Sequence, residues 1–78
     1  SWTEGAMEFD AMPFPLLIAR LSRCYNVDIQ IASKELETMK FTGVIFRNKP
    51  LDFALDIIHR VSDVKFEKKG ETILVKKQ

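Results

Sequence analysis

The sequence predicts a small α+β domain in which two β-α-β units follow one another and a further strand is added to the second unit (βαβ–βαββ). Two helices are expected to pack with two small β-sheets. One observation is that apolar residues switch twice between a period of two and a period of three to four. A second is that a shift of 37 residues, the difference between Pro50 and Pro13, superposes Arg23 on Arg60 and Val27 on Val64. A third is the length: 78 residues with 46% apolar content suffice for one compact core, so residues 1–78 form a single domain.

The first unit begins with an alternation over residues 7–9, which predicts a short strand that ends at Asp10. Pro13 fits the first turn of a helix, where its missing N–H costs nothing. Asn26 can adopt the left-handed conformation that ends a helix, and residues 27–31 then alternate as a second strand. Apolar residues recur at helical spacing between the two strands at Leu17, Ile18, Leu21, Cys24 and Tyr25.

Residues 32–38 are polar and predict a connector with room for one short helical turn. A third strand is expected over Lys40–Phe46. Its apolar side chains cannot all face one side at a period of two, and we therefore expect a β-bulge at Gly43. The residues in conflict are Phe41, Val44 and Phe46.

A second helix is predicted to open at residues 48–50 and to end at Ser62 and Asp63. Its inward stripe is expected to contain Leu51, Ala54, Leu55, Ile58 and Val61. Lys69 and Gly70 fit the two-residue turn of a final hairpin. That turn would place Lys68 opposite Glu71, Phe66 opposite Ile73 and Val64 opposite Val75.

Composition argues against several classes of function. Twelve basic and eleven acidic residues give a net charge of +1, whereas a nucleic-acid-binding domain usually carries a large basic excess. One cysteine and one histidine cannot form an internal disulfide or a four-ligand zinc site within this chain. We expect Cys24 to be a small buried apolar residue, His59 to lie at the rim of its helix, and Asp52 and Asp56 to face water. No enzymatic activity and no cofactor are therefore predicted.

Two apolar residues lie off the inward stripes of their helices. Leu16 and Phe53 are equivalent under the 37-residue shift, and each is about 140° from the centre of its stripe at about 100° per residue. Either each helix packs on two surfaces, so that both residues belong to the core, or both are exposed anchors for a partner protein. Packing in the core is the favoured explanation of the two. Leu74, placed opposite Lys65 on the outward face of the last hairpin, is a similar case.

Several short motifs resemble the C-terminal domain of FecR-type anti-sigma factors. The most telling are the Tyr-Asn-Val that follows the first helix and the Phe-Thr-Gly that precedes the second. The resemblance covers nearly the whole chain and extends, more distantly, to the short N-terminal domain of secretins and TonB-dependent proteins. It is carried by Trp2, residues 5–9, Pro13, residues 21–27, residues 41–43, residues 50–55, Gly70 and residues 73–75. The chain departs from the family pattern at Pro15, Leu16, Cys24 and Phe53.

The resemblance implies a location and a partner. FecR-type proteins cross the inner membrane once, hold an extracytoplasmic-function sigma factor in the cytoplasm, and place this domain in the periplasm. There the domain is expected to receive a signal from the N-terminal signalling domain of a TonB-dependent outer-membrane transducer. Contact with the membrane would occur only through a segment absent from this chain, and no nucleic acid is expected to bind. The related short domain places its two helices between two small sheets.

The partner is expected to contact an open strand edge and outward helix residues. We predict the partner-binding residues to be Leu16, Arg20, Phe53, Ile57 and Leu74. An alternative function is a structural or oligomerisation module of the secretin/TonB short-domain type, and the oligomeric state stays open.

Overall fold

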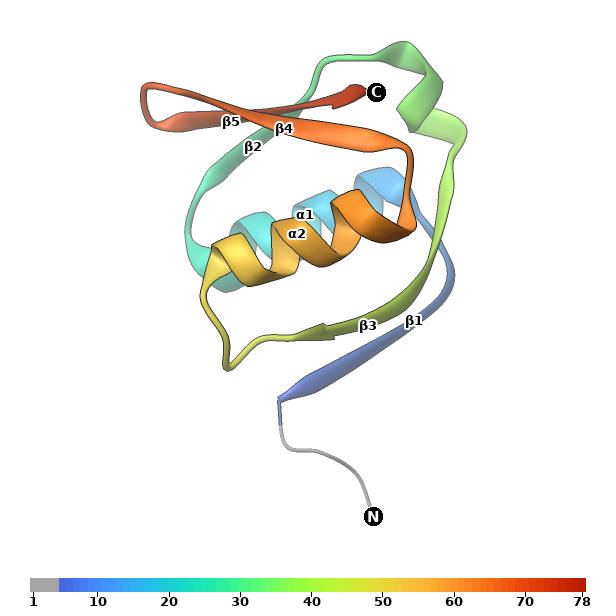
Figure 1. Cartoon of the computed structure of the whole chain (residues 1–78), viewed down its shortest axis with the longest axis vertical. Coiled ribbons are helices and arrows are strands. Elements are labelled where there is room, and N and C mark those ends of the chain that lie inside the picture. Colours follow the sequence, from blue (N-terminus) through green and yellow to red (C-terminus); the bar gives the residue numbers. More distant parts are fainter. Residues whose placement is uncertain (1–4) are drawn as a thin grey trace.

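In the computed structural model, which describes residues 5–78, two small β-sheets enclose two helices (Figure 1). Trp2, which contributes to the family resemblance, lies outside the described residues. The predicted α+β class and the order βαβ–βαββ are confirmed. In chain order the elements are β1 (Ala6–Pro13), α1 (Phe14–Tyr25), β2 (Asp28–Ile31), the short 3-10 helix η1 (Lys34–Thr38), β3 (Lys40–Phe46), α2 (Leu51–Val61), β4 (Val64–Lys69) and β5 (Thr72–Lys77).

The first strands of the two repeated units pair with one another, whereas β5 separates their second strands. The first strands of the two units, β1 and β3, form an antiparallel pair that we call sheet A. Sheet B has the order β2-β5-β4, with β5 parallel to β2 and antiparallel to β4. Sheet B lies above the helices in Figure 1 and sheet A lies below them. The first unit therefore contributes one strand to each sheet, whereas the second contributes β3 to sheet A and both β4 and β5 to sheet B, and the two helices lie between the sheets.

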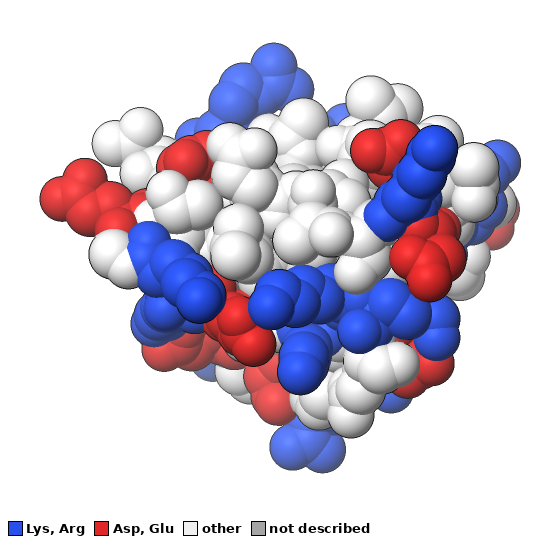
Figure 2. All heavy atoms as spheres, turned by 90° about the horizontal axis from the view of Figure 1, so that it is seen from above, with Lys and Arg blue, Asp and Glu red and all other residues white. Residues whose placement is uncertain are grey.

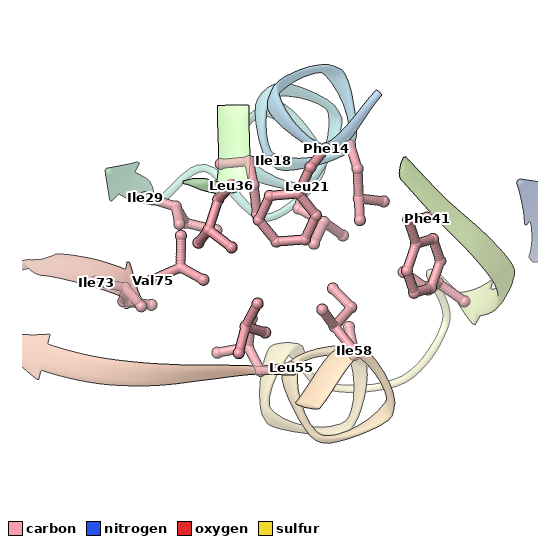
Figure 3. Close-up of a cluster of buried hydrophobic side chains, with 14 of the residues drawn as sticks. Phe14, Ile18, Leu21, Ile29, Leu36, Phe41, Leu55, Ile58, Ile73 and Val75 are labelled. Atoms are coloured by element: carbon pink, nitrogen blue, oxygen red, sulfur yellow. The ribbon is translucent and has the colours of Figure 1, made fainter. Parts of the chain in front are cut away.

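A single apolar core fills the space between the helices and the sheets (Figure 3). Side chains from α1 and α2 point toward one another, and side chains from the two sheets close the sides. The buried residues are Phe14, Leu17, Ile18 and Leu21 of α1; Ala54, Leu55 and Ile58 of α2; Phe9, Phe41 and Ile45 of sheet A; Ile29, Val64, Ile73 and Val75 of sheet B; and Leu36 of η1. Each helix therefore buries the face that meets the other helix.

Strand β1 is longer than predicted and contains a β-bulge. It passes Asp10 and continues to Pro13, with Phe9 opposite Gly43 and Met12 opposite Phe41. Because β1 has one residue more than β3 between these pairs, the bulge lies in β1, and its prediction at Gly43 is wrong. Ala11 has φ 53 within the bulge, and its N–H donates to Thr42 Oγ1 at 2.9 Å.

Strand β3 keeps a regular alternation, which contradicts the predicted change of phase. Phe41 and Ile45 are buried on one face, and Gly43 lies between them on that face. Val44 belongs to the opposite, outer face and is 40% exposed. The apolar pattern of β3 is ambiguous because the inward position 43 carries no side chain, while the outward positions 44 and 46 are apolar.

Asn26 ends α1 in the left-handed conformation as predicted, with φ 55 and ψ 50, and the Val27 N–H donates to the Ser22 carbonyl oxygen at 3.0 Å. Cys24 is exposed rather than buried. Val61, its equivalent in α2, is 57% exposed instead of facing inward. Both predictions fail for the same reason: each residue lies in the last turn of its helix, beyond the last buried position.

The final hairpin forms, but its register differs from the prediction by two residues. Phe66 lies opposite Val75 and Val64 opposite Lys77, and the turn residues are Gly70 and Glu71. Gly70 has φ 62, as a hairpin turn that places glycine at its first central position requires. The three predicted pairings are therefore wrong, although a shift of two leaves every side chain on its expected face. Leu74 consequently lies opposite Glu67 rather than Lys65.

Candidate interaction surface

The five residues predicted to bind a partner come from three elements and form no single patch. Leu16 and Arg20 lie one turn apart on α1, Phe53 and Ile57 lie one turn apart on α2, and Leu74 belongs to β5. Because the buried faces of the two helices meet in the core, their outer faces point to opposite sides of the molecule (Figure 3). Leu74 lies on a third surface, the outer face of sheet B.

Leu16 and Phe53 are exposed, at 55% and 45% of their surface respectively. The favoured explanation of these residues from the sequence, a second buried face on each helix, is therefore wrong. The expected layering of helices between two sheets is nevertheless correct. The two sheets flank the helices without covering their outer faces (Figure 1).

On the outer face of α1, Arg20 is partly engaged with the core. Its guanidinium carbon lies 5.8 Å from the centroid of the Phe9 ring, which is a cation–π contact. The side chain therefore closes the core over Phe9 as well as presenting charge to solvent. Leu16 is the exposed apolar neighbour of Arg20 on this face.

The outer flank of α2 carries an apolar stripe at helical spacing. Phe53, Ile57 and Val61 follow one another at four-residue intervals, and side chains at this spacing line one side of a helix. The ammonium group of Lys49 lies 6.0 Å from the centroid of the Phe53 ring. The sequence places Val61 on the inward stripe, because Val61 follows the buried Ile58 by three residues, a spacing that is also typical of a buried helix face.

The outer face of sheet B presents uncharged atoms framed by charged groups (Figure 2). Half-buried Leu74 belongs to this face, and beside it the Lys76 ammonium group lies 3.0 Å from Glu67 Oε1. The bond from Lys76 and its positive charge hold the pKa of the Glu67 carboxyl below its usual value. At the end of the strand, Asp63 raises the pKa of Lys77 through a contact of 2.6 Å. This surface therefore has an uncharged centre that includes Leu74 and a border that includes two ion pairs.

The remaining polar side chains form no catalytic arrangement in the described part of the chain. His59 lines a shallow groove of about 360 Å³ between α2 and β4, and its Nδ1 lies 2.7 Å from the Val64 carbonyl oxygen. Asp52 and Asp56 line the same groove but face solvent, paired with Lys68 and Arg60. Within residues 5–78 no polar or charged side chain is buried and no group of three metal-binding side chains comes together.

Tyr25 joins the end of α1 to the turn that leads into α2. Its hydroxyl donates to the carbonyl oxygens of Lys49 at 2.8 Å and Phe46 at 3.3 Å. Burial raises the pKa of the Tyr25 phenol above its usual value, which is consistent with its role as a hydrogen-bond donor. The turn that carries Lys49 is thereby held beside Phe53.

A family comparison covers nearly all of this structure. The protein-family model described as "FecR, C-terminal" matches residues 6–75. The chain belongs to the FecR C-terminal family. The resemblance noted from the sequence is thereby confirmed. The matched range includes every helix and strand of this FecR C-terminal domain except the last two residues of β5.

Solved structures show the same fold. A candidate anti-sigma factor from Parabacteroides distasonis ATCC 8503 has a crystal structure at 1.65 Å that matches with a TM-score of 0.83 and 24% identity, over 96% of this chain and 35% of that one. A second crystal structure, at 2.50 Å, matches with a TM-score of 0.84 and 24% identity, over 99% of this chain and 36% of that one. The FecR C-terminal domain thus spans about a third of the length of these chains. No curated protein matches the chain.

None of the helices in the described part of the chain combines the length and the apolar character needed to cross a membrane.

Proposed function

We propose that this FecR C-terminal domain is a non-enzymatic receiver module that binds the N-terminal signalling domain of a TonB-dependent outer-membrane transducer. The whole protein would be an anti-sigma factor that relays this binding toward an extracytoplasmic-function sigma factor. In this proposal the domain lies in the periplasm and is attached to the inner membrane by a single spanning segment outside this chain. The partner-binding residues are drawn from Leu16, Arg20, Phe53, Ile57 and Leu74.

The observation that carries the proposal is the exposure of large apolar side chains on a domain whose described polar groups build no catalytic cleft. Leu16, Val44, Phe53 and Val61 are between 40% and 57% exposed. Exposed apolar groups rimmed by charge are typical of protein interaction sites. Membership of the FecR C-terminal family supports the same class of function, a regulatory protein that acts by binding proteins.

Binding can transmit a signal only if the partner prefers one state of the receiver. A ligand shifts an equilibrium by its difference in affinity for the two states, and by no more than that. The transducer's signalling domain is therefore expected to bind the anti-sigma factor more tightly in one state than in the other. This difference in affinity would bias the hold of the N-terminal part of the protein on the sigma factor.

Isothermal titration calorimetry tests the proposal directly. The purified signalling domain of a transducer from the source organism is titrated into the wild-type domain and into the variants Leu16→Asp and Phe53→Asp. We expect the wild type to bind and at least one variant to bind at least tenfold more weakly, which corresponds to about 1.4 kcal/mol. Absence of wild-type binding to every such domain would contradict the proposed function, whereas unchanged binding by both folded variants would remove only these two residues.

The alternative function is a structural or oligomerisation module like the short domain of secretins and TonB-dependent proteins. The open strand edges of the two sheets favour it, because an open edge can pair with another copy of the chain. Light scattering at high protein concentration distinguishes this alternative from a receiver that acts as a monomer.

A further inference from the structure

The two sheets expose four strand edges, and three of them are protected against pairing with another strand. On β1 the edge is interrupted by the bulge and carries Glu8, Asp10 and Pro13. On β4 the edge carries four lysine and glutamate side chains among its six residues. The β2 edge is only four residues long and begins with Asp28. Bulges, charges, proline and short length are the usual means of blocking an open edge.

The edge of β3 has none of these features. Its sequence contains no charged residue and no proline from Phe41 to Phe46. The Arg47 N–H donates to the Gly5 carbonyl oxygen at 2.9 Å, which makes Arg47 and Gly5 a hydrogen-bonded pair of the antiparallel ladder. Because such pairs alternate along the ladder, Val44 opposite Glu8 directs its own N–H and C=O toward the free edge. An added strand could therefore bond to β3 at its centre.

The apolar stripe of α2 borders this same edge. The Asp52 side chain pairs with Lys68 of β4 at 3.4 Å, so this flank of α2 faces sheet B. Phe53, Ile57 and Val61 lie on the opposite flank, toward sheet A. In sheet A, β1 packs against α1 whereas β3 packs against both helices, and the free edge of β3 consequently lies on the α2 side.

Sheet A has one strand fewer than sheet B, and the uncovered apolar groups gather where the next strand would lie. Of the four large apolar side chains that are exposed among residues 5–78, three belong to β3 or to this flank of α2, namely Val44, Phe53 and Val61. A strand added to β3 would place alternate side chains under the α2 stripe and the others beside Val44 on the outer face.

We propose that Val44, Phe53, Ile57 and Val61, here named the β3-edge surface, bind an extended segment of the partner protein as a third strand of sheet A. This inference rests on the proposed function and assigns the contact within it. Main-chain hydrogen bonds to β3 supply affinity, and the apolar stripe selects a segment with apolar residues at alternate positions.

The charges around the edge indicate the chemistry of that segment. Lys40 precedes the uncharged part of β3, and Arg47 and Lys49 follow it. Each of the four ion pairs found in the described part of the chain uses another cation, namely Arg60, Lys68, Lys76 or Lys77. The bound segment is therefore expected to carry acidic residues near its two ends.

The same charges disfavour a second copy of the domain as the occupant. A symmetric antiparallel pairing centred on Val44 would place Lys40 of one copy opposite Asn48 of the other, between Arg47 and Lys49. Three cations would then lie close together at each end of the paired strands, where their mutual repulsion opposes the pairing. The charges thus favour an acidic segment of another protein.

The test uses the signalling domain of the transducer as the probe and two pairs of measurements. Phe53→Asp is matched by Ala32→Asp, which adds the same negative charge at an exposed position after β2, outside the predicted partner-binding residues. An acidic side chain in the first turn is favourable to a helix, so Phe53→Asp is expected to fold, and thermal unfolding checks the fold of Ala32→Asp. Val44→Pro removes the central edge donor, and thermal unfolding establishes whether it remains folded.

We expect Phe53→Asp and folded Val44→Pro each to weaken binding at least tenfold, and Ala32→Asp to bind within twofold of the wild type. Amide hydrogen exchange provides a second readout that needs no variant. In the complex, exchange at Val44 is expected to slow at least tenfold, whereas exchange at Phe66 on the open edge of β4 stays unchanged.

Unchanged affinity of Phe53→Asp together with unchanged exchange at Val44 would overturn strand addition at β3 and leave the proposed function intact. Protection of Phe66 instead of Val44 would also overturn it, by moving the contact to β4. A wild-type dimer that Val44→Pro dissociates would assign the edge to a second copy and overturn the choice of occupant. A wild type that does not bind the probe contradicts the proposed function, and this inference with it.

Discussion

Gly43 allows the Phe41 ring to lie across the inner face of sheet A. A Cβ atom at this position would lie 2.9 Å from Phe41 Cζ, closer than such atoms approach in proteins. The ring in turn meets Phe9 edge to face, with 6.0 Å between centroids. The glycine thus provides room for an aromatic pair rather than a bulge.

Replacement of this glycine by alanine is expected to strain the core. Gly43→Ala should lower the free energy of unfolding by about 1–3 kcal/mol, because the added methyl group displaces a buried ring. Urea unfolding followed by circular dichroism measures the change. Val44→Ala on the outer face serves as the control and should have a much smaller effect, since Val44 is 40% exposed. Equal stability of Gly43→Ala and the wild type would show that Phe41 can move aside at no cost.

At the scale of elements, the connector between the two repeats contributes to the core more than its composition suggests. Residues 32–38 contain one apolar residue besides Ala32, and this residue, Leu36, is completely buried by the 3-10 helix η1. The Leu36 N–H donates to the Ser33 carbonyl oxygen at 3.1 Å, and Leu36 then accepts a bond from Met39 at 3.3 Å. The 3-10 helix η1 therefore packs against α1 and against β2 and β5 of sheet B, and Leu36 is its buried residue.

Truncation of this leucine is expected to be as costly as truncation of a helix residue in the core. Leu36→Ala should lower the free energy of unfolding by about 2–5 kcal/mol, because it removes a fully buried side chain and leaves a cavity. Lys34→Ala in the same turn is the matched control, since Lys34 is exposed. Chemical unfolding of both variants provides the measurement. A loss below 1 kcal/mol for Leu36→Ala would mean that the connector is only loosely attached to the core.

Elements whose ends depend on one residue were predictable, and details that depend on two strands were not. Asn26 acts on its own backbone, so the end of α1 followed from the sequence, whereas Pro13, predicted in the first turn of the helix, is the last residue of β1, and Pro15 is the proline of that turn. The bulge could lie in either member of the β1–β3 pair, and the pattern of one strand cannot decide between them. The hairpin register depended on whether Gly70 is the first or the second residue of the turn, which alternation at period two does not distinguish.

Taken as a whole, the molecule is an uneven sandwich, with three strands on one side of its helices and two on the other. The candidate site could be predicted only in part for this reason. The exposure of Phe53 was open from the sequence, because a residue on an outer helix flank is covered or free depending on how many strands lie beneath it. Val44 could not be recognised as an exposed residue from the sequence, because Gly43 occupies an inward position without a side chain and so hides the alternation of β3.

The basic residues at both ends of β3 lead to a prediction about the oligomeric state of the domain. The isolated domain should be monomeric at 9.0 kDa, because Lys40, Arg47 and Lys49 oppose symmetric pairing of β3 between copies. Multi-angle light scattering over a range of protein concentrations measures the mass. A mass that doubles or rises steadily with concentration at physiological salt would favour the oligomerisation module over the receiver.

Strand β5 stands outside the 37-residue repeat, yet it occupies the centre of sheet B and joins β2 of the first unit to β4 of the second. Sheet B cannot form until β5 has been synthesised, because β2 and β4 both pair with β5. Although the sequence contains two similar halves, the halves are expected to fold together, because β5 joins them in sheet B. A nascent chain that stalls before Thr72 would therefore present its apolar residues to chaperones and proteases instead of half a folded domain.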